Sequence, residues 1–357
     1  MLRLALLAAV PVAPVLHYVF HLPPIWVFLA GLVGVGVLAE WIRAATDQLA
    51  LHTGPAVGGL LSISLGSLAE LILALFILVG GDTAVVQAQI TGSILATALL
   101  GLGLSIVVGG ATRERQVFQR ERAGLLSTML LLCVVGLLLP AVFDYTGRHV
   151  VHTRDIAVSD EAISLLVSAV LLGLYAANLV FTLVTHRDVF ARGKDGGETE
   201  DETPEWPVWQ CLAVLAAATA AAALESELIS DDLEQAAASL HMSQVFLGVV
   251  VLALVGTIAD LFSAVFFARQ DRMGLVMSIC IGSAIQVSLV VAPLLVILSW
   301  ALGSPMTLVF GNPLNLFAIA ATAFVVNAVT HDGETTWFEG VLLIGVYILF
   351  GIAFFFA

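Results

Sequence analysis

The sequence predicts an all-α polytopic membrane protein with about eleven transmembrane helices. Of its 357 residues, 60% are hydrophobic and only 11% are charged, whereas soluble domains carry roughly 25% charged residues. Apolar runs long enough to cross a bilayer, which takes about 20 residues, follow one another along almost the whole chain. A stretch of the first half also recurs in the second half at a fixed offset. These observations exclude a water-soluble globular chain.

Eleven apolar runs are candidates for spans. The first is read as a retained span and not as a signal peptide, because a second apolar run begins at Pro24 without a small-residue cleavage site. An odd number of spans places the two termini on opposite sides of the membrane. The eleven candidates are residues 4–21, 24–42, 56–80, 85–110, 123–143, 162–185, 207–225, 243–268, 273–301, 306–329 and 338–356.

The distribution of basic residues predicts the orientation. With a cytoplasmic N-terminus, eleven of the thirteen Lys and Arg residues fall on the inside, and only Arg148 and Arg154 fall on the outside. This bias agrees with the positive-inside rule. We therefore expect an integral multi-pass protein of the plasma (inner) membrane, with its C-terminus on the face opposite the cytoplasm.

Acidic residues outnumber basic ones by 27 to 13, which argues against nucleic acid as a partner because phosphate binding needs clustered Lys and Arg. Two acidic runs, residues 195–205 and 225–234, are expected to be solvated. The alternative is an acidic surface that concentrates cations near a pore mouth. No GxxxxGK[ST] phosphate loop is present, which argues against an ATP-driven pump.

An internal repeat organises the chain. Residues 66–71 (GSLAEL) recur 190 positions later as residues 256–261 (GTIADL), and the same offset maps Gly92-Ser93 onto Gly282-Ser283. The two copies lie five spans apart, and an odd offset inverts the second copy in the membrane. Such inverted repeats are typical of secondary transporters with a site at the bilayer midplane. We expect an extra helix at 1–22, a first five-helix repeat at 23–190, an acidic cytoplasmic linker at 191–206 and a second repeat at 207–357.

Two acids lie deep in apolar spans at equivalent positions of this repeat, Glu70 and Asp260. An ionisable group at such depth is costly and indicates a functional site. A protonated structural carboxyl is the alternative for either residue alone, but the repeat makes it a poor explanation for both. Two carboxylates supply the charge that a divalent cation such as Ca²⁺ needs in order to shed water.

Further oxygen ligands are expected around these acids. Gly66 and Gly256 would let their helices open and free backbone carbonyls. For each hydroxyl, the alternative is a hydrogen bond to the backbone carbonyl one turn back. The supporting ligand candidates are Ser67, Thr257, Ser93, Ser283, Thr97 and Gln286. A looser repeat, at an offset of 187, relates four acids with a possible gating or cation-gathering role: Glu40, Asp47, Glu227 and Glu234.

The same two carboxylates suggest how protons couple to the cation. Both must be ionised to bind a divalent cation, and protonation removes the charge that attracts it. Cation and protons then compete for one site, and burial favours the protonated form enough for exchange near physiological pH. No cofactor is expected beyond the transported Ca²⁺ and H⁺.

These motifs resemble those of the calcium/proton exchanger family of the cation/calcium antiporter superfamily. The resemblance extends over nearly the whole chain and includes QAQITGSILATALLGLGLSIVVGG at 87–110, the second acidic repeat from Ser243 and the C-terminal stretch from Val325. It implies a Ca²⁺/H⁺ antiporter and distinguishes the chain from sodium/calcium exchangers, which lack this ending.

The chain also departs from the family pattern, which has Gly-Asn-Ala-x-Glu in both repeats. Ser67 and Thr257 replace the two asparagines, Asp260 replaces the second glutamate and Thr97 replaces a further asparagine. The two acidic residues keep the charge of the site. Three amide ligands become shorter hydroxyls, however, and one carboxylate is shortened by a methylene, so the distances that the ligands can reach change. The alternatives are therefore an exchanger coupled to Na⁺ or another cation and, more remotely, an intramembrane di-carboxylate enzyme.

Overall fold

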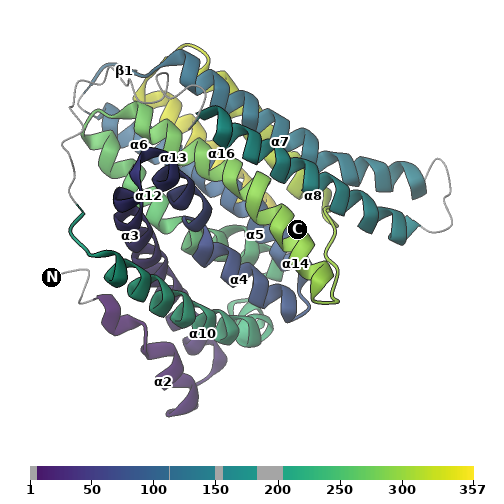
Figure 1. Ribbon diagram of the computed structural model, residues 1–357. Coiled ribbons are helices and arrows are strands. Elements are labelled where there is room, and N and C mark those ends of the chain that lie inside the picture. The colour runs from purple at the N-terminus through teal and green to yellow at the C-terminus, as the bar shows by residue number, and fades with distance from the viewer. Residues whose placement is uncertain (1–5, 112, 149–155, 183–203) are drawn as a thin grey trace. The chain divides into compact units, whose positions relative to one another are not determined.

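The computed structural model describes residues 6–111, 113–148, 156–182 and 204–357, without the side chains of 54–64, 156 and 157. The described chain is almost entirely helical, with one short two-stranded sheet (Figure 1). Among the described residues, nine helices are long and apolar enough to cross a membrane, and two shorter apolar helices accompany them. Each of the eleven predicted runs falls on one of these helices, so the predicted all-α polytopic class is confirmed.

The chain divides into two compact units. The first comprises Met1–Val86, Leu179–Ala259 and Ala357, and the second comprises Gln87–Asn178 and Asp260–Phe356. Each unit thus combines segments from both halves of the sequence, and the units cut across the repeat boundaries that the sequence predicts. Most of the predicted linker at 191–206 lies outside the described residues, of which only 204–206 belong to it.

The first unit is built on α3 and α10. Its elements are η1 (Leu7–Ala9), α2 (Val12–Tyr18), α3 (Pro24–Leu65), α4 (Leu68–Val79), α10 (Val208–Leu240), α11 (Gln244–Phe246), the π-helical η5 (Leu247–Leu252) and the first residues of α12 (Ala253–Arg269). α3 packs along α10 and α4 packs against both. Small residues make this packing close, since Ala218 and Ala222 of α10 lie in one buried cluster with Leu38 and Ile42 of α3.

The backbone of α3 differs from the expected pair of separate spans. The sequence predicts a break between residues 42 and 56, whereas α3 is helical from Pro24 to Leu65. A straight helix of that length would extend about 63 Å, yet Ala69, just beyond its end, shares the buried cluster of Ile42. The path of the chain from Ile42 to Ala69 is therefore not straight, and residues of the two predicted spans pack in one cluster.

α10 also differs from the prediction. The predicted span ends at residue 225 and is followed by a solvated acidic run, whereas the helix continues to Leu240. Glu225 and Asp232, both in that run, are buried, as is Ser226. The expectation of a solvated run is wrong for this face of the helix, because the apolar stripe through Ala222 and Ile229 carries those side chains inward.

The second unit contains most of the remaining helices. Its elements are α5 (Thr83–Leu95), the π-helical η2 (Ala96–Gly101), α6 (Leu102–Gly110), β1 (Gln116–Val117), α7 (Arg120–Thr146), α8 (Ile156–Val180), α13 (Met273–Gln286), the π-helical η6 (Val287–Val291), α14 (Ala292–Ala301), α15 (Pro313–Thr330), β2 (Glu334–Thr335) and α16 (Trp337–Phe356). β1 and β2 pair antiparallel, with Gln116 opposite Thr335. α6 and α16 approach closely at Gly103 and Gly340, where a Cβ on Gly103 would lie 2.8 Å from the Gly340 oxygen.

The repeat is visible in the secondary structure of this unit. α5 and α13 begin 190 residues apart, η2 and η6 end 190 residues apart, and α6 and α14 begin 190 residues apart. Both copies thus interrupt an α-helix with a π-helical segment at the same point. Such segments occur frequently at functional sites.

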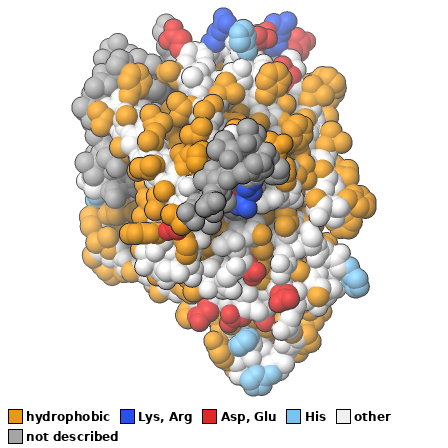
Figure 2. All heavy atoms as spheres, turned by 90° about the vertical axis from the view of Figure 1, so that its right-hand side faces the viewer, with side chains coloured by type: hydrophobic (Ala, Val, Ile, Leu, Met, Phe, Trp, Pro, Cys, Tyr) orange, Lys and Arg blue, Asp and Glu red, His pale blue; other side chains and the backbone are white. Residues whose placement is uncertain are grey.

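The surface is that of a membrane protein. Figure 2 shows hydrophobic side chains over much of the visible face, with few charged ones between them. Large apolar side chains are exposed on many helices, including Phe262, Phe317 and Phe324. Contiguous apolar surface of this kind suits contact with lipid.

Candidate functional site

Glu70 lies at a helix start in the first unit. α3 ends at Leu65, α4 begins at Leu68, and Ser67 is the residue that precedes its first turn. The predicted opening of the helix at Gly66 therefore coincides with an interruption in the structure. Glu70 falls in the first turn of α4 and is only 4% exposed. Free backbone N–H groups and the helix dipole favour negative charge at this position.

The second copy of the motif lies directly against Glu70. A Cβ on Gly256 would lie 3.4 Å from Cγ of Glu70 and 3.7 Å from its Cδ. The Glu70 side chain therefore packs against α12 at Gly256, where a methyl group would be in ordinary van der Waals contact with it and a larger side chain would not fit. Thr257, the next residue, is buried and donates its hydroxyl to the Ala253 carbonyl at 2.8 Å. This is the hydrogen bond to the carbonyl one turn back that the sequence predicts as the alternative. Because the hydroxyl uses only its hydrogen in this bond, the lone pairs of Thr257 Oγ1 are still available to a cation.

α12 does not open where the sequence predicts. The helix runs unbroken through Gly256, in contrast to the interruption at Gly66. The departure from regular α-helix in this copy is the π-helical segment Leu247–Leu252, which ends four residues before Gly256. The prediction that Gly256 frees backbone carbonyls is therefore wrong for this structure, in which Gly256 lies against the Glu70 side chain within a continuous helix.

Asp260 and Ser283 meet in the second unit. Ser283 Oγ donates a hydrogen bond of 2.6 Å to Oδ2 of Asp260. Asp260 is half-buried and Ser283 is buried. The structure thus joins two of the predicted ligand candidates, from α12 and α13.

The remaining candidates lie at the π-helical segments of the second unit. Thr97, within η2, is fully buried and donates its hydroxyl to the Ser93 carbonyl at 2.8 Å. Ser93 is also fully buried, and its own hydroxyl has no hydrogen-bond partner among the described residues. Gln286 is half-buried at the end of α13, immediately before η6. η2 packs against α13, so the two Gly-Ser helices of the repeat are neighbours.

The four acids of the looser repeat lie on two helices, Glu40 and Asp47 on α3 and Glu227 and Glu234 on α10. Glu40 is half-buried on α3, and Asp47 is exposed with an ion pair to Arg43 at 4.0 Å. Residues next to Glu40 cluster with Ala222, whereas Glu234 is exposed about 18 Å further along α10. Glu227 is also exposed. Within the described chain, no three His, Cys, Asp or Glu side chains form a group suited to a metal ion.

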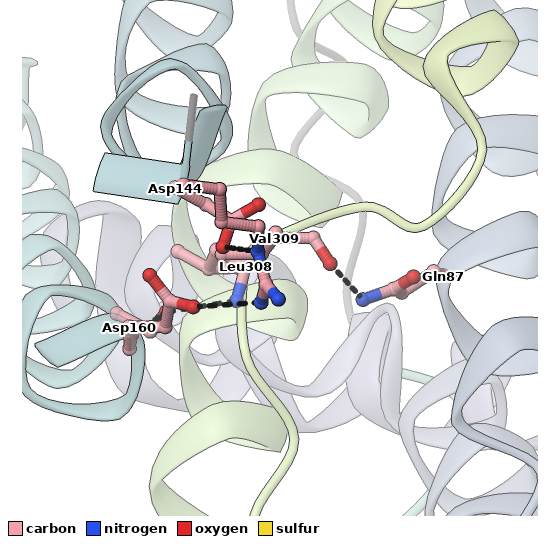
Figure 3. A network of polar contacts seen from close by, with 7 residues as sticks. Gln87, Asp144, Asp160, Leu308 and Val309 are labelled. Atoms are coloured by element: carbon pink, nitrogen blue, oxygen red, sulfur yellow. Dashed lines mark hydrogen bonds and ion pairs between the residues drawn. The ribbon is translucent and has the colours of Figure 1, made fainter. Parts of the chain in front are cut away.

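A polar network that the sequence reasoning missed holds an extended segment of the second unit (Figure 3). Gln87 donates its amide to the carbonyls of Thr307 and Val309 at 3.1 and 2.9 Å. The hydroxyl of Ser164 accepts a 3.0 Å hydrogen bond from the Leu308 amide and donates to the Asp160 carbonyl. The backbone between α14 and α15 is therefore fixed by side chains of α5 and α8.

Charged groups extend this network at the end of α7. Arg148 contacts Asp144 at 2.5 Å and Asp160 at 3.5 Å. Asp160 is only 4% exposed, so Arg148 neutralises a buried carboxylate. Asp144 lies in the last turn of α7, Arg148 lies two residues beyond the end of that helix, and Asp160 lies in the second turn of α8. No local sequence pattern indicated that these three side chains meet.

Glu225 is the buried acid that the sequence reasoning assigned to the solvated run. Its side chain is 1% exposed. The helical spacing of Ala218, Ala222, Glu225 and Ile229, three or four residues apart, is the signal that could have located it on the buried face.

Comparison with known proteins gives matches along nearly the whole chain. The family model described as sodium/calcium exchanger protein matches residues 23–184 and 211–356. A Ca(2+)/H(+) antiporter of Aphanothece halophytica is 35% identical over 362 residues, covering 98% of this chain and 95% of that protein. A Ca(2+)/H(+) antiporter of Synechocystis is 38% identical, with coverages of 92% and 90%. The Bacillus subtilis Ca(2+)/H(+) antiporter ChaA is 35% identical, with coverages of 98% and 97%.

Solved structures show the same architecture. Native YfkE superposes with a TM-score of 0.84 at 30% identity, covering 100% of both chains. The H⁺/Ca²⁺ exchanger CAX gives a TM-score of 0.73 at 15% identity, covering 99% of this chain and 91% of that one. At such identity this second likeness concerns the fold alone.

Proposed function

Because the chain belongs to the sodium/calcium exchanger protein family, we propose that it is a secondary active antiporter that exports Ca²⁺ in exchange for H⁺. Several relatives of near-equal length carry the name Ca(2+)/H(+) antiporter, and the resemblance predicted from the motifs is thereby confirmed. Sodium/calcium exchange or exchange of another cation is the alternative within the same family.

The observation that carries the proposal is the contact between Glu70 and Gly256. It joins the acid of the first repeat to the motif of the second, one helical turn before Asp260 on α12. We propose that Glu70 and Asp260 together bind the cation when ionised and the protons when neutral. The hydroxyls of Ser67, Thr257 and Ser283 would add oxygen ligands suited to Ca²⁺.

The remaining parts of the proposal follow from the repeat. Two inverted repeats at 23–190 and 207–357 would present this site alternately to the two faces of the membrane. The N-terminus would be cytoplasmic, in agreement with the charge bias. Four acids on α3 and α10 would attract cations toward the two entrances: Glu40, Asp47, Glu227 and Glu234.

Proton-driven ⁴⁵Ca²⁺ uptake into proteoliposomes tests the function. The proposal expects uptake to follow an imposed proton gradient and to disappear in Glu70→Gln and in Asp260→Asn. Glu114→Gln, which neutralises an exposed loop carboxylate, is the matched control and should retain wild-type uptake. Uptake driven by a Na⁺ gradient alone would favour the alternative, and full activity in both site variants would contradict the proposed site.

A further inference from the structure

Glu225 occupies a cradle made by two glycines. A Cβ on Gly34 would lie 3.0 Å from Cδ of Glu225 and 3.2 Å from each of its carboxyl oxygens. A Cβ on Gly31 would lie 3.4 Å from Oε2. The carboxyl group therefore fills the space that the missing side chains of α3 leave. Gly34 is ten residues, about 15 Å, from the start of α3, so the cradle lies well inside the helix pair.

The carboxyl group has no polar partner in the part of the chain that the structure describes. Neither Oε1 nor Oε2 accepts or donates a hydrogen bond there, and Glu225 forms no ion pair with a described residue. None of the described titratable groups on the elements packed on α10 is a hydrogen-bond partner of the Glu225 carboxyl. They are His17 and Tyr18 on α2, Glu40, Arg43, Asp47 and His52 on α3, and Glu70 on α4.

An isolated ionised carboxylate cannot be accommodated in such a place. Transfer of an unpaired charge into an apolar interior costs far more than any packing there returns. Ca²⁺ takes six to eight oxygen ligands, whereas among the described residues Glu225 belongs to no group of three His, Cys, Asp or Glu side chains that could hold a metal ion. The ligand that fits an unpartnered carboxylate in this space is a proton.

We propose that Glu225 is a third intramembrane proton-binding carboxyl, separate from Glu70 and Asp260, which holds its proton while α3 and α10 are packed at Gly31 and Gly34. Release leaves a carboxylate and gives one H⁺ to water, and it requires the two helices to part so that water reaches the oxygens. The protonation state of Glu225 is thus linked to the packing of α10 on α3. It goes beyond the proposed exchange site, because it binds no Ca²⁺.

Infrared difference spectroscopy of the purified full-length protein in lipid, recorded against pH, tests the proposal directly. The wild type should show a protonated-carboxyl C=O band that is lost in Glu225→Gln and retained in the double variant Glu70→Gln/Asp260→Asn. Glu114→Gln should leave the band unchanged. A spectrum of Glu225→Gln identical to that of the wild type would overturn the proposal. This measurement needs no transport, so its result is independent of whether the proposed Ca²⁺/H⁺ exchange is correct.

Carbodiimide labelling of the wild type covers the case in which Glu225→Gln does not fold. Carbodiimides react with protonated carboxyls in apolar surroundings, and mass spectrometry then identifies the modified peptide. We expect modification at Glu225 that increases when transport conditions open the helices. Absence of modification at Glu225 under all conditions, with modification of Glu70 or Asp260 in the same sample, would contradict the proposal.

Discussion

The hydroxyl of Ser283 donates a 2.6 Å hydrogen bond to Oδ2 of Asp260, a residue 23 positions earlier in the chain. The bond joins α12 to α13 and fixes one oxygen of a carboxylate that we assign to cation binding. Hydrogen bonds to charged groups contribute about 1.5–3 kcal/mol. The orientation of Asp260 thus depends on a neighbouring helix as well as on its own.

Ser283→Ala should weaken cation binding. Loss of the donor leaves the Asp260 carboxylate less well oriented, and a loss of about 1.4 kcal/mol corresponds to a tenfold change in affinity. We expect the KM for ⁴⁵Ca²⁺ uptake to rise about tenfold, while Ser283→Thr, which keeps the hydroxyl, stays near the wild-type value. An unchanged KM in Ser283→Ala would show that the bond does not serve cation binding.

Side-chain size at Gly256 should control access of Glu70 to α12. A Cβ there lies 3.4–3.7 Å from Glu70, which is ordinary van der Waals contact, so Gly256→Ala should retain uptake. Gly256→Leu adds atoms that occupy the space of the Glu70 side chain, and uptake should fall to background. Thermal unfolding in detergent separates loss of transport from loss of folding. Equal activity in the two variants would be inconsistent with the assigned contact.

The Gly34 cradle predicts a coupling between two positions. Gly34→Ala places a methyl group about 3 Å from the Glu225 carboxyl, and overpacking of this kind costs about 1–3 kcal/mol. The melting temperature should therefore fall. In a Glu225→Ala background the methyl group has room, so the same substitution should cost much less. A double-mutant cycle measures the difference, and additive effects would argue against contact.

Removal of Arg148 should destabilise the second unit. Asp160 is 4% exposed, so Arg148→Ala leaves a buried carboxylate without its counter-charge. We expect a loss of about 1–2 kcal/mol, between the values for exposed and buried ion pairs. Asp160→Asn in the same chain should restore much of the thermal stability because it removes the unpaired charge. If Asp160→Asn does not restore stability, Arg148 stabilises the unit through its ion pair with Asp144 and not through its ion pair with Asp160.

Asp82 predicts a pH-dependent effect outside the spans. Burial, with a further contribution from the charge of Glu234, raises the pKa of the Asp82 carboxyl above its ordinary value of about 3.9. An acid with a raised pKa contributes stability below its ordinary pKa and loses it as the pH rises through the folded-state value.

At a pH below the ordinary pKa of Asp82, Asp82→Asn should therefore melt at the same temperature as the wild type. At a pH above the raised folded-state pKa, it should melt at a higher temperature than the wild type. Glu234→Gln should reduce the gain, because it removes the second cause of the shift. Melting curves recorded against pH in detergent check both statements. A stability gain that grows as the pH falls would have the wrong sign.

Hydrophobic run length and register predicted the membrane class and located part of every apolar helix, although α3 and α10 extend beyond the predicted spans. Glu70 and Asp260 could be singled out because an ionisable residue in an apolar span is costly wherever the helix packs. The burial of Glu225 depends on which face of α10 meets α3, and the length of the spans alone does not determine that face. The contacts of Gln87 with the 307–309 backbone join residues more than 200 positions apart, and no local pattern specifies such a pairing.

The π-helical segments that end at Gly101 and Val291 have a consequence for the ancestry of the chain. A π-helical turn holds more residues than an α-helical one, so a single insertion in one copy would shift every later position by one. The offset is 190 at the Gly66 motif before these segments and again at the starts of α6 and α14 after them. The two copies therefore have the same number of residues across this stretch, so an insertion in one copy alone does not account for the irregular turn.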